Sequence, residues 1–104
     1  MSEYINLYQN QLTGSLPKNL ILPNLYYLDV GYNLLTGLLP EGFVKTSLEL
    51  GHLHLDHNQF HGPLPDSYLS GLDVLEALTV DHNQLTGEVP AGGPETLGEY
   101  CWID

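Results

Sequence analysis

The stretch NQLTGSLP at Asn10–Pro17 decides the fold, because close copies of it return along the chain. They read NLLTGLLP at Asn33–Pro40, NQFHGPLP at Asn58–Pro65 and NQLTGEVP at Asn83–Pro90. Successive leading asparagines are 23, 25 and 25 residues apart. A fixed period of this length is the signature of a repeat architecture, in which each unit packs on its neighbours. The sequence therefore predicts a solenoid.

A short alternating run precedes each copy. It reads LxxLxLxxN before Asn33, Asn58 and Asn83, and IxLxxN before Asn10. Such alternation predicts a strand with one buried face, and stacking in parallel is what buries that face. The expected strands lie near residues 4–7, 27–30, 52–55 and 77–80. The expected core positions on them are Ile5, Leu7, Leu28, Val30, Leu53, Leu55, Leu78 and Val80.

This pattern, continued by Leu-Thr-Gly-x-Leu-Pro, resembles the leucine-rich repeat family and its plant-type subfamily. The resemblance covers roughly residues 3–90. It implies an α/β solenoid, a right-handed coil of about four repeats with a short parallel sheet on the concave face. The expected repeats are about 1–17, 18–40, 41–65 and 66–90. Residues 91–104 are expected to form a C-terminal cap or the start of a further repeat, with Tyr100 and Trp102 covering the last core layer.

Three recurrent residue types have structural roles in this interpretation. The asparagines are expected to form a ladder that pairs free backbone groups in the turns. The glycines Gly14, Gly37, Gly62 and Gly87 are expected in turns where a Cβ is costly. The connecting segments are expected to run along the convex side, with helical or 3₁₀ turns. Their expected inward residues are Leu20, Leu22, Phe43, Leu48, Tyr68 and Leu72.

Composition limits the classes of partner. The chain has 104 residues and a formal charge of -11, with only two basic side chains, Lys18 and Lys45. This charge disfavours nucleic acid and anionic membranes and favours a neutral or basic partner. A single cysteine, Cys101, excludes an internal disulfide framework. We expect no membrane insertion in this segment and find no signal peptide at its start.

The variable positions between the leucines are expected to line the concave sheet, the surface that solenoids use for binding. Four columns follow from stacking the repeats: Tyr4, Tyr27, His52 and Ala77; Asn6, Asp29, His54 and Thr79; Tyr8, Gly31, Asp56 and Asp81; Gln9, Tyr32, His57 and His82. Exposed tyrosines provide contact area at a low entropy cost. The candidate ligand-binding residues are Tyr4, Asn6, Tyr8, Tyr27, Asp29, Tyr32, His52, His54, Asp56, His57, Thr79, Asp81 and His82.

The stretch GHLHLDH at residues 51–57 resembles a metal-binding signature of the metallo-β-lactamase superfamily. The repeat accounts for its spacing, because Leu53 and Leu55 must point inward. We therefore assign no catalytic residue, no metal and no cofactor, and the chain has no kinase signature. A looser cation site stays open, formed by His52, His54, Asp56, Asp81 and His82. Protonation of adjacent His57 and His82 is expected to weaken partner binding at low pH.

The sequence thus favours a non-enzymatic, protein- or peptide-binding module, a fragment of a receptor-like protein. The alternatives are an ectodomain piece of a receptor-like kinase whose catalytic domain lies elsewhere, an enzyme-inhibitor protein, and a structural spacer. Residues of the first repeat lack a polar capping unit, so self-association through that layer is expected. The compartment is not fixed by these residues; the resemblance implies an extracellular or membrane-attached parent protein.

Overall fold

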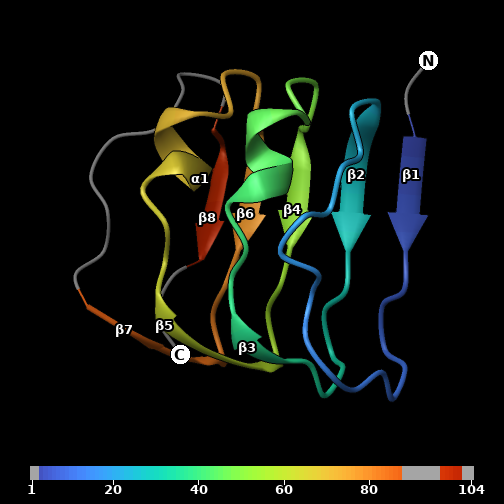
Figure 1. Cartoon of the computed structure of the whole chain (residues 1–104), viewed down its shortest axis with the longest axis vertical. Coiled ribbons are helices and arrows are strands. Elements are labelled where there is room, and N and C mark those ends of the chain that lie inside the picture. Colours follow the sequence, from blue (N-terminus) through green and yellow to red (C-terminus); the bar gives the residue numbers. More distant parts are fainter. Residues whose placement is uncertain (1–2, 88–96, 102–104) are drawn as a thin grey trace.

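The computed structural model describes residues 3–87 and 97–101, except for the side chains of residues 43–44 and 99–101. In this part of the chain, five parallel strands form the main sheet in the order β1-β2-β4-β6-β8 (Figure 1). Each strand belongs to a different turn of the solenoid. The strands are β1 (Glu3–Asn6), β2 (Leu25–Asp29), β4 (His52–His54), β6 (Ala77–Thr79) and β8 (Glu99–Cys101). The predicted parallel solenoid is confirmed.

The register of the main sheet matches the predicted columns. Tyr27 pairs with Tyr4 on one side and with His52 on the other, and His52 pairs with Ala77. Strand β8 continues this register beyond β6, with Ala77 opposite Glu99. The expected covering of the last layer by the Tyr100 and Trp102 side chains lies outside the described residues.

A second parallel sheet was not predicted. It contains β3 (Thr36–Leu38), β5 (Gln59–Pro63) and β7 (Gln84–Thr86), in that order. These strands come from the Leu-Thr-Gly segments and, in β5, from their Phe-His-Gly counterpart. The segments stack because the near-constant period brings equivalent parts of the repeat together. Gly62 shows why glycine stands there: its φ is +81°, and a Cβ would meet Leu38 Cδ2 at 2.5 Å.

Two short helical elements complete the turns. A 3₁₀ helix, η1, spans Gly42–Lys45, and α1 spans Ser67–Ser70. Figure 1 shows both in front of the main sheet. Tyr68 and Leu69 of α1 are buried, as the inward side of the solenoid requires. No helix in the described part of the chain has the length and apolarity that crossing a membrane requires.

The core lies between the main sheet and the connecting segments. All predicted core residues of β2, β4, β6 and the positions just after them are buried: Leu28, Val30, Leu53, Leu55, Leu78 and Val80. Ile5 is partly buried. The prediction for Leu7 is wrong, since it is 42% exposed. It follows β1, the edge strand, so only one neighbouring turn covers it.

The predictions for the connecting segments are mixed. Tyr68 and Leu72 are fully buried, and Leu20 and Leu22 pack against the core as predicted. The Phe43 side chain lies outside the described residues. The prediction for Leu48 is wrong, because this side chain is 63% exposed. The buried position is Ser47 instead, whose hydroxyl donates a hydrogen bond of 2.8 Å to the Leu22 carbonyl.

The asparagine ladder is confirmed. The Asn58 amide nitrogen donates to the carbonyls of Val30, Leu55 and Asp56, and its Oδ1 accepts from the Leu35 N–H at 3.0 Å. Equivalent bonds are made by Asn33 and Asn83. Each side chain therefore joins its own turn to the turn before it. This satisfies backbone groups that the strands leave free.

Candidate binding surface

Aromatic and imidazole rings form a first row along the strands of the main sheet. Tyr4 stacks on Tyr27 with ring centroids 5.4 Å apart, and Tyr27 lies 5.4 Å from His52 and 5.6 Å from His54. Parallel pairing produces the row, because residues in register are neighbours on one face. We call these four residues the strand row.

A second row of rings lies just beyond the strand ends. Tyr8 meets Tyr32 edge-on at 5.3 Å, Tyr32 stacks on His57 at 3.8 Å, and His57 stacks on His82 at 4.1 Å. The rings of the last two pairs are nearly parallel, with interplanar angles of 12° and 10°. We call these four residues the ring column. Aromatic stacks of this kind contribute about 0.5–1.5 kcal/mol per pair beyond burial.

Three of the four ring-column residues, all except Tyr8, have a left-handed backbone. Tyr32, His57 and His82 have φ of 56°, and Gln9 in the first turn has φ of 57°. Each immediately precedes a ladder asparagine, whose bonds hold the turn in place. Residues other than glycine rarely adopt this conformation, and its cost is of order 1–3 kcal/mol. The ladder therefore fixes the direction of the rings. The repeat pattern of the sequence did not predict this left-handed conformation.

A polar network connects the two rows. The Thr79 hydroxyl donates to Asp56 Oδ1 at 2.8 Å, and His54 Nδ1 lies 3.0 Å from the Thr79 hydroxyl oxygen. Asp56 Oδ2 lies 2.8 Å from His57 Nδ1. An ionised carboxylate only accepts, so His57 carries its proton on Nδ1. Because the Thr79 proton points to Asp56, His54 donates to Thr79.

Three predicted surface positions are buried: Asp29 and Thr79, at 9% and 7% exposure, and Ala77, at 3%. The Asp29 carboxylate accepts the Gly31 N–H at 2.9 Å and the Tyr27 hydroxyl at 3.4 Å. A short side chain that bonds back to its own turn does not project from the sheet. The pKa of Tyr27 is raised by partial burial and then by the Asp29 charge. These residues therefore support the surface rather than form it.

The other candidate residues are accessible. Tyr4, Asn6, Tyr8, Tyr32 and His82 are exposed. The remaining candidates are half-buried: Tyr27, His52, His54, Asp56, His57 and Asp81. The structure thus gathers eleven of the thirteen candidate residues on an accessible surface, once Asp29 and Thr79 are set aside.

A family model for the leucine rich repeat matches residues 23–85, more than half of the chain. The chain belongs to the leucine-rich repeat family. A segment of 43 residues is 51% identical to Receptor-like protein 35 of Arabidopsis thaliana. The matched segment covers 41% of this chain and 4% of that relative, so the chain corresponds to a small part of the relative's length.

Two surface residues of this leucine-rich repeat chain were missed by the sequence analysis. The Tyr26 ring lies 5.5 Å from both Tyr4 and His52. Its space comes from Gly51 in the next turn, where a Cβ would meet Tyr26 Cε1 at 2.7 Å. Glu76 lies with its Oε1 3.4 Å from His52 Nε2. In the aligned repeats, Gly51 stands at the position of Tyr26, and this exchange of a large residue for glycine could have indicated that the Tyr26 ring lies over the next turn.

Proposed function

We propose that this leucine-rich repeat chain is a non-enzymatic protein- or peptide-binding module, part of a receptor-like protein, and that it binds through the concave face of the main sheet. Leucine-rich repeat domains mediate protein interactions, and solenoids present extended concave surfaces to their partners. The observation that carries the proposal is the pair of ring rows. They place aromatic contact area along the main sheet from β1 to the end of β6.

The chemistry of the two rows favours a basic partner. Tyr4 and Tyr32 are 67% and 43% exposed, so their faces are accessible to a cationic side chain. The carboxylates of Asp56 and Asp81 lie beside the ring column. Both lysines of the chain are elsewhere: Lys45 ends η1, and Lys18 lines a pocket near the second sheet. A lysine- or arginine-containing segment would therefore meet rings and negative charge together.

The receptor-like assignment is supported by the similarity to Receptor-like protein 35. That name favours a receptor-like protein over a kinase ectodomain or an enzyme inhibitor. It also supports the non-enzymatic proposal, because repeats of this family supply a recognition surface rather than reacting groups. The chemistry of the surface supports a class of partner: an extended segment with basic side chains.

A displayed random-peptide library tests the proposal. The folded chain is immobilised, and enriched peptides are measured individually by fluorescence anisotropy. We expect basic sequences, and we expect the double variant Tyr8→Ala with Tyr32→Ala to weaken their binding at least tenfold. An alanine in place of a tyrosine that is a hot spot of an interface costs about 2 kcal/mol or more, which corresponds to a larger factor than ten.

Ile21→Ala is the matched control, since Ile21 is 65% exposed and is not on the ring rows. Binding that survives the double tyrosine variant but is lost in Ile21→Ala would move the site off the concave face. Enrichment of acidic peptides would contradict the charge argument. Failure to enrich any sequence against the folded chain would favour a structural spacer.

A further inference from the structure

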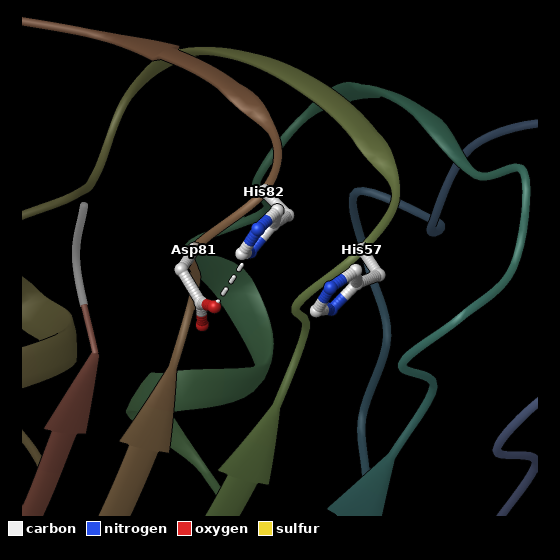
Figure 2. A group of neighbouring side chains, drawn as sticks. All are labelled: His57, Asp81 and His82. Atoms are coloured by element: carbon white, nitrogen blue, oxygen red, sulfur yellow. Dashed lines mark hydrogen bonds and ion pairs between the residues drawn. The ribbon is translucent and has the colours of Figure 1, made fainter. Parts of the chain in front are cut away.

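Three side chains at one end of the ring column form a compact group of metal-ligand type. Figure 2 shows His57, Asp81 and His82 just past the ends of β4 and β6. One ligand atom from each lies within 4.8 Å of the other two. The two imidazole rings stack at 4.1 Å, so their equivalent nitrogens are neighbours. Adjacent turns of the solenoid hold all three residues in register.

Each of the two imidazoles has a carboxylate on its Nδ1. Asp56 Oδ2 lies 2.8 Å from His57 Nδ1, and Asp81 Oδ2 lies 2.8 Å from His82 Nδ1. Asp56 holds the proton on His57 Nδ1, which leaves the lone pair of His57 on Nε2. Asp81 is itself a member of the proposed group, and a carboxylate at Nδ1 cannot also reach an ion on Nε2 of the same ring. Zinc would therefore bind His82 through Nδ1, in place of the proton that lies between this nitrogen and Asp81. Histidines that bind metals commonly donate their other nitrogen to a carboxylate, as His57 does to Asp56, which fixes the ring and raises its basicity.

The carboxylates differ in a way that suits different roles. Both oxygens of Asp56 are engaged, one by His57 and the other by the Thr79 hydroxyl at 2.8 Å. Among the residues that the structure describes, none donates a hydrogen bond to Asp81 Oδ1. Asp56 is therefore built as an orienting group for His57, whereas Asp81 keeps an oxygen that is able to bind a cation.

Burial and charge also favour a cation. The side chains of His57 and Asp81 are 27% and 17% exposed, while His82 is 54% exposed. The group is thus partly shielded from solvent but open on the His82 side, where water can complete a coordination shell. Asp56 and Asp81 lie in adjacent turns, and neither lysine of the chain is near them. A divalent cation would offset their mutual repulsion.

We propose that His57, Asp81 and His82 bind one zinc ion, with water in the remaining position. Two nitrogens and one carboxylate oxygen suit zinc, whereas magnesium and calcium prefer oxygen ligands. Zinc bonds of about 2 Å place tetrahedral ligand atoms roughly 3.3 Å apart. The ligand atoms, which lie within 4.8 Å of one another, would have to approach to this spacing by rotation of the side chains.

The proposed site differs from the cation site left open by the sequence, which included His52 and His54 and omitted His57. The rings of His52 and His54 are 5.9 Å apart. His52 Nε2 is near Glu76, and His54 donates to Thr79. Alternation along one strand therefore does not make the chelate. The two histidines of the proposed site instead occupy the left-handed position that precedes the ladder asparagine in two adjacent turns.

Isothermal titration calorimetry of the folded 104-residue chain with zinc chloride, in a buffer that does not bind zinc, tests the proposal. We expect one ion per chain, and at least tenfold weaker binding in His57→Asn and in His82→Asn. Asparagine removes the imidazole but tolerates the left-handed backbone. Asp81→Asn, which keeps the size of the side chain, should also weaken binding. His61→Asn, at an exposed histidine of β5, should leave binding unchanged.

Proton NMR of the histidine rings gives a second readout that needs no variant. Signals from His57 and His82 should shift together and stop shifting at one equivalent of zinc, while His61 signals stay in place. Three results would overturn the proposal. The first is wild-type zinc affinity in His57→Asn and His82→Asn. The others are a loss of affinity in His61→Asn as large as in those variants, or one ion shared by two chains. Circular dichroism of each variant confirms that a loss of binding is not a loss of fold.

Discussion

At the scale of single residues, the ladder asparagines are the polar side chains with the greatest structural role. Asn58 is 8% exposed and bonds to backbone groups of its own turn and of the preceding turn. We expect Asn58→Ala to lower the free energy of unfolding by about 1–3 kcal/mol, because buried backbone groups lose their partners. Urea unfolding followed by circular dichroism measures the change.

Asn10→Ala is the matched control for Asn58→Ala. Asn10 is exposed, and among the described residues its side chain bonds only to the Leu7 and Tyr8 carbonyls in the first turn. Water replaces these partners at little cost, so its unfolding midpoint should move less. Equal losses in the two variants would mean that burial of the ladder does not determine its contribution.

Some residue-scale features were predictable and others were not. The repeated Asn58 position identified the ladder, because a polar residue at a fixed place in every repeat needs a structural role. The burial of Asp29 was not predictable, since it depends on the hydrogen bond that Asp29 accepts from the Gly31 N–H. The left-handed turn at His57 was also missed, because histidine does not mark positive φ as glycine does. The zinc proposal depends on this turn.

At the scale of elements, α1 fastens one turn of the solenoid to the previous one. Tyr68 is fully buried in α1, and its hydroxyl donates to the Pro40 carbonyl at 2.6 Å. The pKa of Tyr68 is raised well above its ordinary value by burial, with the Glu41 charge as a second cause. The neutral phenol is therefore part of the folded state.

This raised pKa predicts a loss of stability in base. An unfolded tyrosine releases its proton near pH 10. Tyr68 keeps its proton when folded, so above about pH 10 unfolding releases a proton and the free energy of unfolding falls. The contribution is complete below about pH 10 and declines by at most about 1.4 kcal/mol per pH unit above it. Urea unfolding of the wild type between pH 8 and pH 11 should show the decline.

Two variants separate Tyr68 from the other tyrosines. Tyr68→Phe should be less stable by about 0.5–1.5 kcal/mol at pH 8, because the hydrogen bond is lost, and should show a shallower decline above pH 10. Tyr32→Phe, at an exposed tyrosine, should keep the wild-type slope. Parallel curves for the wild type and Tyr68→Phe would show that another group causes the loss in base.

The elements also show where the repeat pattern is sufficient. Alternation around Leu53 and Leu55 predicted β4 and its parallel partners, because only one register buries both leucines. The second sheet was missed, because Leu-Thr-Gly reads as a turn until stacking supplies partners for its backbone. Leu48 was misplaced because spacing alone does not show that the Ser47 hydroxyl pairs with a buried carbonyl.

At the scale of the whole molecule, the solenoid is nearly one-dimensional, so the stability of each turn depends on its neighbours. The turn that contains β1 lies at an edge of the main sheet. Leu7, Tyr8 and Leu12 in this turn are 42%, 45% and 38% exposed. By contrast, Leu53 and Leu55 in the middle of the sheet are fully buried. The described structure therefore predicts a gradient of stability along the solenoid.

Hydrogen exchange and association measure this gradient together. Amides of β1 should exchange faster than those of β4, because local opening of an edge turn exposes little additional apolar surface. The exposed leucines should also make the 104-residue chain associate, which sedimentation velocity detects as a concentration-dependent mass. A polar capping repeat joined before Glu3 should slow exchange at β1 and keep the chain monomeric. Uniform protection from β1 to β6 in a monomeric chain would contradict the gradient, since it would mean that the first turn is held as firmly as the turns covered on both sides.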